Sequence, residues 1–178
     1  MITSGHSLDE NSVFTDTIYQ PKRKVTGDNN LIGEAMAWEV PEPLTTTEFD
    51  AGIIVRDQDI LFSFDLAEDD GTYGRKIIGR FAWNIIKDTL IDFNINIKKQ
   101  GKETGRTEGP LVEVIDVENK VFSADTNAFF GDSGSPSYIV SDSDPTEVAS
   151  LGILNGAING NTAYTAVEEI ENRFGVTV

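Results

Sequence analysis

A serine at the centre of a tight turn is the first feature of this sequence that could do chemistry. Ser133 lies in the stretch 125-DTNAFFGDSGSPSYIV-140, between an aromatic pair and an apolar run. Glycine, aspartate, serine and proline are common turn residues, so an ordinary hairpin turn is one interpretation. The other is a serine nucleophile on a strained loop, which requires a base, an acid that orients the base, and donors for an oxyanion. The rest of the chain has to supply these groups.

The base and the acid have one clear candidate each. His6 is the only histidine among the 178 residues, so any mechanism that needs an imidazole must use it. It follows a short β-like start that would bring the ring to a surface. Asp50 stands directly before the apolar run at residues 51–55, where burial of a carboxylate without a partner would be costly. Pairing with His6 would explain that burial.

The composition limits the class of protein. Thirty Asp and Glu residues against 14 Lys and Arg give a net charge of −16, which would repel nucleic-acid phosphates and anionic lipids. We therefore expect no nucleic-acid partner and no membrane partner, and no apolar run approaches the roughly 18 residues of a membrane span. Cysteine is absent, so the sequence offers neither disulfides nor a thiolate metal site. We expect no cofactor and no metal, and we find no signal peptide that would settle localisation.

Alternation of apolar and polar residues predicts an all-β protein, a sandwich or a barrel. The clearest alternating run is residues 91–98, in which three isoleucines and a phenylalanine fall on one face. The other predicted strands are short apolar or alternating runs between turn residues. They lie near residues 14–20, 33–40, 51–56, 61–65, 111–117, 121–122, 137–140, 148–154 and 162–164.

Only the end of the chain predicts a helix. Residues 165–168 (Thr-Ala-Val-Glu) match a capping box, Val167, Ile170 and Phe174 would share one face, and Gly175 stands where a C-terminal cap belongs. The polar residues 67–75 show weak periodicity and are interpreted as a linker between two halves.

Taken together, these motifs resemble a trypsin-like serine peptidase of the chymotrypsin clan, of the cysteine-free bacterial or viral type. Residues 3–6 resemble its histidine motif, residues 49–53 its aspartate motif and residues 131–136 its serine motif. Residues 150–152 resemble the strand that lines the substrate pocket, and residues 101–109 the turn that opens the second barrel. The order His, Asp, Ser is that of chymotrypsin.

The resemblance implies a chymotrypsin-like double β-barrel with a C-terminal α-helix. Residues 1–70 would form the first barrel and supply the histidine and aspartate, residues 71–164 would form the second barrel with the serine and the pocket, and residues 165–178 the helix and tail. Because the histidine comes so early, the first barrel would lack its first strands at the N-terminus. An upstream segment or a second chain would then complete it.

The same resemblance implies a serine endopeptidase that acts on a polypeptide substrate. Ser133 would attack the scissile carbonyl, His6 would take and return the proton, and Asp50 would hold the imidazole. The backbone N–H groups of Gly131 and Ser133 would form the oxyanion hole. The expected substrate-binding residues are Asn127 and Ala128 at the pocket floor, Phe130 at the rim, and Ser150, Leu151 and Gly152 as one wall.

Two further expectations concern charge. Asp132 would need a buried cationic partner to hold the oxyanion turn in shape, and Lys98 and Lys99 are the candidates. No carboxylate is expected at the pocket floor, and His6 is already used, so we expect a neutral residue on the acyl side of the scissile bond (P1).

Two other functions stay open from the sequence. The chain could be a non-catalytic or incomplete protease-like module used for binding, although all three positions of the triad are occupied by suitable residues. It could also be a self-processing serine protein that cleaves only its own precursor.

Overall fold

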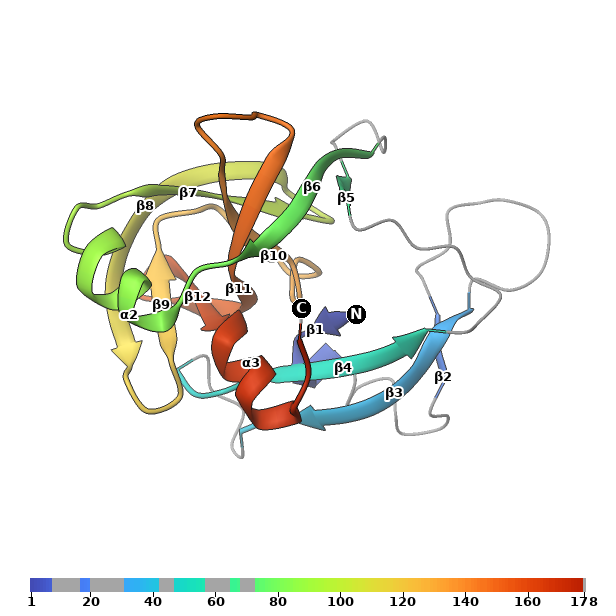
Figure 1. The fold of residues 1–178 in the computed structure, drawn as a ribbon. Coiled ribbons are helices and arrows are strands. Elements are labelled where there is room, and N and C mark those ends of the chain that lie inside the picture. The colour runs from blue at the N-terminus through green and yellow to red at the C-terminus, as the bar shows by residue number, and fades with distance from the viewer. Residues whose placement is uncertain (8–16, 20–30, 42–46, 57–64, 68–72, 178) are drawn as a thin grey trace.

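The computed structural model describes residues 1–7, 17–19, 31–41, 47–56, 65–67 and 73–177 (Figure 1). The predicted strand at residues 61–65 lies outside this part of the chain except for its last residue. The predicted strand at residues 14–20 is described only over 17–19, where the chain is indeed extended.

Six strands form a closed barrel, which holds the serine motif. Their order is β10-β7-β8-β9-β12-β11, and β11 pairs again with β10 to close the ring. The strands are β7 (Asn96–Gly101), β8 (Gly105–Asp116), β9 (Val121–Ala124), β10 (Pro136–Val140), β11 (Glu147–Ile158) and β12 (Asn161–Ala166). Closure leaves no unpaired edge within the ring. The predicted all-β fold, with strands in these regions, is confirmed.

Two more strands extend this sheet beyond the ring. β6 (Tyr73–Arg80) runs parallel to β11, and β5 (Asp65–Ala67) pairs with β6. The prediction of a linker over residues 67–75 was therefore wrong at residue 67 and at residues 73–75, because Ala67 of β5 pairs with Tyr73 of β6 and Leu66 pairs with Arg75. This backbone pairing overrides the weak local pattern.

The first part of the chain forms a second, four-stranded sheet. Its order is β1-β4-β3-β2, made by β1 (Ile2–Thr3), β2 (Thr17–Tyr19), β3 (Leu31–Glu39) and β4 (Ala51–Arg56). All three pairings are antiparallel. Within the described residues β1 and β2 are the two end strands of this sheet, which lies below and to the right of the barrel in Figure 1.

The strand predicted at residues 91–98 was wrong over residues 91–95, since β7 begins at Asn96. The chain forms α2 (Trp83–Ile85) and the π-helical turn η1 (Ile86–Leu90), and residues 91–94 are a turn. Two backbone hydrogen bonds hold this part of the chain, from the Ile91 N–H to the Ile86 carbonyl at 3.1 Å and from the Ile95 N–H to the Leu90 carbonyl at 3.0 Å. Phe93 is consequently 74% exposed, although the alternation had assigned it to a buried face.

The C-terminal helix is confirmed as α3 (Val167–Phe174), but its cap is not the predicted box. The N-cap residue is Ala166, with no side-chain cap bond. Thr165 belongs to β12 and its hydroxyl is used elsewhere, which removes it from the helix start. Gly175 does end the helix in the left-handed conformation, at φ 64°.

Two apolar cores matter for the site. One fills the barrel and includes Ile97, Phe122, Leu151 and Tyr164. The other lies where the first sheet, β11 and α3 meet, and consists of Phe49, Ala51, Ile53, Ile153 and Ile170. Full burial of side chains of this size contributes roughly 1.5–3 kcal/mol each. The second core therefore fixes the first sheet against the barrel.

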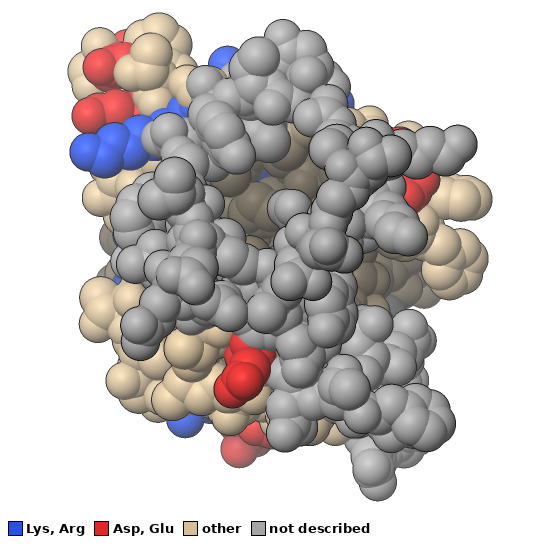
Figure 2. All heavy atoms as spheres, turned by 90° about the vertical axis from the view of Figure 1, so that its right-hand side faces the viewer, with Lys and Arg blue, Asp and Glu red and all other residues tan. Residues whose placement is uncertain are grey.

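The described residues contain no helix long and apolar enough to cross a membrane. They also contain no group of three or more His, Asp or Glu side chains suited to a metal ion. On the face shown in Figure 2, the charged side chains of the described residues form a few small clusters, and the cluster at the upper left contains both acidic and basic residues.

Candidate active site

His6 and Asp50 are brought together by the pairing of β1 with β4. Thr3 lies opposite Gly52 in this antiparallel pair, so the turn after β1 meets the residues that precede β4. Asp50 Oδ2 lies 2.5 Å from His6 Nδ1, and Asp50 Oδ1 accepts the His6 backbone N–H at 2.9 Å. The aspartate is 1% exposed and the histidine 17%. Both carboxylate oxygens thus fix the histidine, one through Nδ1 of the ring and the other through its backbone N–H.

Gly5 permits this close approach. A Cβ at Gly5 would overlap the Glu39 carbonyl oxygen and lie 2.9 Å from Asp50 Oδ1. A side chain at this position would therefore push the turn of His6 away from its aspartate. Position 5 therefore requires glycine for steric reasons.

Ser133 lies on a double turn between β9 and β10. The Asp132 N–H donates to the Phe129 carbonyl at 3.0 Å, and the Ser135 N–H donates to the Asp132 carbonyl at 2.9 Å. Gly131 and Gly134 have φ of 99° and 82°, which side chains rarely adopt. The backbone of this turn is therefore specified by its glycines, as the sequence motif suggested.

The turn of Ser133 packs directly on the histidine segment. A Cβ at Gly134 would overlap Thr3 Oγ1 and lie 3.1 Å from the Ser4 backbone nitrogen. The far side of the turn is bonded to β11, through the Gly134 N–H to the Leu154 carbonyl at 2.9 Å. Ser133 is half-buried. Strand β1 thus brings the serine turn and the histidine turn together, although they are more than 120 residues apart in the sequence.

The amides that were expected to form the oxyanion hole are available as donors. Within the part of the chain described, neither the Gly131 N–H nor the Ser133 N–H makes a hydrogen bond. Both residues are at least partly accessible. Two unpaired N–H groups beside a serine can stabilise a developing negative charge.

Asp132 is the anchor of the turn. Its carboxylate accepts bonds from the backbone N–H groups of Glu103 (2.7 Å) and Phe129 (3.0 Å), from Thr104 Oγ1 (2.7 Å), and from Lys99 Nζ (3.2 Å). Lys99 and Asp132 are both 0% exposed. Lys99 is therefore the buried cation that the sequence left open between two lysines. Lys98 points outward and pairs with exposed Glu108.

Alternation along β7 explains which lysine is buried. Ile97, Lys99 and Gly101 face inward, while Lys98 and Gln100 are less buried. Burial opposes ionisation of Asp132, but its hydrogen bonds outweigh burial and lower its pKa to about 2. Burial also lowers the pKa of Lys99, and the nearby Asp132 carboxylate partly offsets this.

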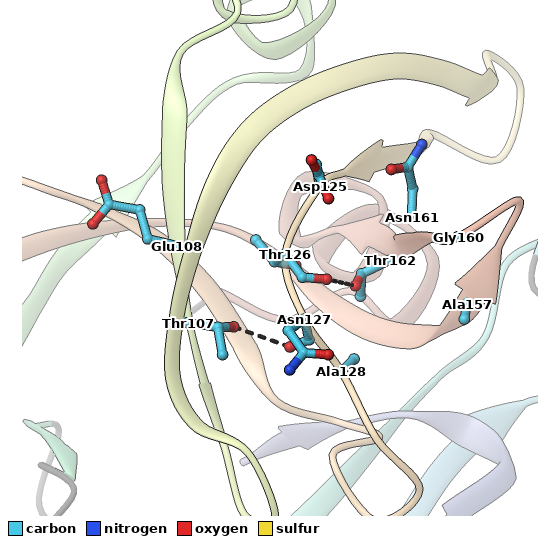
Figure 3. A pocket seen from close by; sticks show the side chains of 10 residues that line it. All are labelled: Thr107, Glu108, Asp125, Thr126, Asn127, Ala128, Ala157, Gly160, Asn161 and Thr162. Atoms are coloured by element: carbon cyan, nitrogen blue, oxygen red, sulfur yellow. Dashed lines mark hydrogen bonds between the residues drawn. The ribbon is translucent and has the colours of Figure 1, made fainter.

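A cavity of about 470 Å³ opens beside the segment that leads to Ser133 (Figure 3). The residues that line it are small or polar: Thr107, Glu108, Asp125, Thr126, Asn127, Ala128, Ala157, Gly160, Asn161 and Thr162. Tyr164 Oη bonds Thr126 Oγ1 at 2.6 Å, and Thr162 Oγ1 donates to the Thr126 carbonyl at 2.5 Å. These bonds hold the 125–128 segment against β12.

The structure brings only part of the expected pocket together. Asn127 and Ala128 line the cavity, and Phe130 is 91% exposed, edge-on to Phe129. Ser150, Leu151 and Gly152 are buried in the barrel wall and do not line it.

Ala157, Asn161 and Thr162 line one wall of this cavity, which residues 150–152 do not reach. These wall residues flank a hairpin turn at Asn159 and Gly160, whose φ are 50° and 85°. An Asn-Gly pair between apolar runs is a strong hairpin signal that the sequence analysis did not use. Two carboxylates, Asp125 and Glu108, also line the cavity, although none was expected at its floor.

The fold is that of the chymotrypsin-like serine proteases, as the sequence motifs indicated. A glutamic acid-specific serine protease that uses a histidine triad in substrate binding matches with a TM-score of 0.70 at 18% identity, over 99% of this chain and 84% of that one. Cellulomonas bogoriensis chymotrypsin matches with a TM-score of 0.64 at 15% identity, over 99% and 84%. Thermobifida fusca protease A matches with a TM-score of 0.63 at 15% identity, over 99% and 82%.

No protein-family model matches the sequence, and a comparison with curated proteins gives no match. At identities of 14–18% the structural matches establish the fold. The chemistry has to be argued from the residues of this chain.

Proposed function

We propose that this protein is a serine endopeptidase that hydrolyses peptide bonds through Ser133, His6 and Asp50. The observation that supports it most is the bond between buried Asp50 and the Nδ1 atom of the only histidine. A buried carboxylate has little other use at this place, because both of its oxygens bond the histidine residue.

Each step of the proposed reaction uses one group of this site. Ser133 Oγ attacks the carbonyl carbon of the scissile bond while its proton passes to His6 Nε2. Asp50 stabilises the imidazolium, and the N–H groups of Gly131 and Ser133 stabilise the oxyanion. The C–N bond then breaks, the proton passes from His6 to the leaving amine, and water hydrolyses the ester on Ser133 with His6 as base.

The pH dependence of activity tests the role of His6. Protonation of the imidazole removes the base, so kcat/KM for a peptide substrate is expected to fall in acid with a midpoint somewhere between about 6 and 7. The measurement is kcat/KM between pH 4 and 9, with melting curves to show that the chain stays folded. Activity that stays flat down to pH 4 would remove His6 from the mechanism.

We further propose that the cavity beside residues 125–128 receives the P1 side chain. Its charged lining groups are both acidic: Asp125, and Glu108, whose carboxylate pairs with Lys98 and turns away from the other lining side chains in Figure 3. The remaining lining is small or polar. A P1 glutamate would meet like charge there, and juxtaposed like charges are costly at an interface. The glutamate-specific structural relative uses a histidine triad, whereas this chain has a single histidine.

The matched comparison is a pair of peptides that differ only in P1 Glu against P1 Gln. We expect kcat/KM to be at least about tenfold lower for the glutamate peptide. Asp125→Asn should narrow the gap, while Asp142→Asn, a change on a distant exposed turn, should leave it unchanged. A preference for P1 glutamate would contradict this assignment of the cavity.

The two other candidate functions predict different results. A non-catalytic module would not react with a fluorophosphonate probe, which labels an activated serine. A self-processing protein would change its own intact mass on incubation and leave added peptides uncut. Hydrolysis of added peptides with turnover separates the proposed function from both.

A further inference from the structure

The position of Asp50 depends on groups far from it in the sequence. Asp50 belongs to the loop that precedes β4 in the first sheet. The two residues before it, Glu48 and Phe49, nevertheless contact side chains of β11 and of α3. Because its two carboxylate oxygens hold His6 at both the ring and the backbone, any displacement of Asp50 would displace the imidazole as well.

The barrel holds this loop through two buried side chains, Thr165 and Asn155. The Asp50 backbone N–H donates to Thr165 Oγ1 at 3.4 Å, and Thr165 Oγ1 donates to Asn155 Oδ1 at 3.0 Å. Asn155 Nδ2 donates to the Glu48 carbonyl at 3.2 Å and lies 2.8 Å from Thr165 Oγ1. Thr165 is 0% exposed and Asn155 4%.

A β-bulge directs Asn155 toward the loop. In the pairing of β11 with β12, Leu154 lies opposite Tyr164 and Gly156 lies opposite Ala163, so Asn155 is the extra residue. A bulge re-aims the side chain of the extra residue and is common beside active sites. The bulge in β11 therefore lets the side-chain amide of Asn155 reach the Glu48 carbonyl.

The C-terminal helix holds the same loop from another side. Phe49, next to Asp50, is 2% exposed and packs against the ring of Phe174 at 5.9 Å. The Arg173 guanidinium lies 4.1 Å from the centre of the Phe49 ring, and it also pairs with Glu39 of β3 and Glu169 of α3. A cation over an aromatic face is attracted to it. Residues 48–50 are thus held on both sides.

We propose that Thr165, Asn155 and Arg173 are positioning residues for Asp50 and, through it, for His6. This inference rests on the proposed function. It implies that the position of Asp50 is fixed by side chains from the last quarter of the chain. None of the three would touch the substrate. Each would act by fixing the backbone of residues 48–50.

The test compares Thr165→Val, which removes the hydroxyl at nearly constant shape, with Thr165→Ser, which keeps it. A misplacement of about 1 Å can cost on the order of 100-fold in rate, so we expect Thr165→Val to lower kcat by about tenfold or more with KM little changed. Thr165→Ser should stay near wild type. In the valine variant the midpoint of the pH profile should also move to lower pH, because a displaced carboxylate stabilises the imidazolium less.

A loss of packing alone would not move that midpoint in a chain that is still folded. If Thr165→Val fails to melt cooperatively, Arg173→Gln at the surface takes its place, with Arg75→Gln as the control; it should lower kcat and shift the midpoint in the same direction. Wild-type kcat and midpoint in the folded valine variant, or in Arg173→Gln, would overturn the inference while leaving the proposed function intact. A wild-type chain without hydrolysis or probe labelling would overturn the proposed function itself, and this inference with it.

Discussion

Replacing Ser133 or His6 by alanine is expected to lower kcat/KM for a peptide substrate on the order of 10⁴-fold, and the double variant should lose little more. The two residues share one proton transfer, so removing either removes the same step. The measurement is kcat/KM for the two single variants and the double variant, with thermal melts beside it.

Ser143→Ala is the matched control for these variants. Its hydroxyl bonds only locally to Ser141 on an exposed turn, so it should keep wild-type activity. Losses that multiply in the double variant would mean that Ser133 and His6 act independently, which the proposed mechanism does not allow.

Lys99→Met is expected to cost about 3–5 kcal/mol in the free energy of unfolding, because it leaves the Asp132 carboxylate buried without its cation. The adjacent Lys98→Met is the control, since its ion pair with Glu108 is exposed and should be worth about 0–1 kcal/mol. Activity should fall on the order of 100-fold in Lys99→Met, because Asp132 holds the turn on which the oxyanion donors lie. Equal effects of the two lysine variants on unfolding would contradict a structural role for the buried pair.

The low pKa of Asp132 adds a test in acid. Its pKa is about 2 in the folded chain, below the ordinary value of about 3.9. A lowered pKa contributes stability that is present above about pH 4 and is lost as the pH falls toward 2. The stability gap between wild type and Asp132→Asn should therefore be wide at pH 5 and narrow by roughly 2–3 kcal/mol at pH 2. A gap that stays constant over this range would mean that the carboxylate is not held as described.

The sequence could predict the pairing of His6 with Asp50, and of Asp132 with one of two lysines, because few residues of each type were candidates. A single histidine left one candidate base, and Asp50 before an apolar strand needed a partner. Alternation along β7 also contains the answer to the choice between Lys98 and Lys99, since Lys99 shares its face with fully buried Ile97. These inferences rest on residue chemistry and a period of two, both of which are local.

The parts that could not be predicted depend on distant pairing. Residues 91–94 alternate like a strand, but hydrogen bonds from the π-helical turn before them fix a different backbone. The sequence pattern predicts Thr165 as a helix cap, but its hydroxyl instead bonds the Asp50 N–H and Asn155 Oδ1, which are distant in the sequence. Neither outcome is encoded within a short window of sequence.

The pocket wall is an intermediate case. Residues 150–152 matched a family motif, but they are buried against the barrel core and β10. The cavity is lined instead by Ala157, Asn161 and Thr162, next to the turn at Asn159 and Gly160. The turn signal was present in the sequence, and using it would have extended the predicted strand at residues 148–154 toward the end of β11 at Ile158.

The central claim is that Ser133 is a nucleophile activated by His6, and covalent labelling tests it most directly. The wild-type chain would be treated with a fluorophosphonate probe, and the adduct would be counted by intact mass and located by peptide mapping. The proposed function predicts one phosphonyl group per chain, on Ser133, with no label in Ser133→Ala and slow labelling in His6→Ala. A folded wild-type chain that stays unlabelled, or that is labelled at another residue, would contradict it.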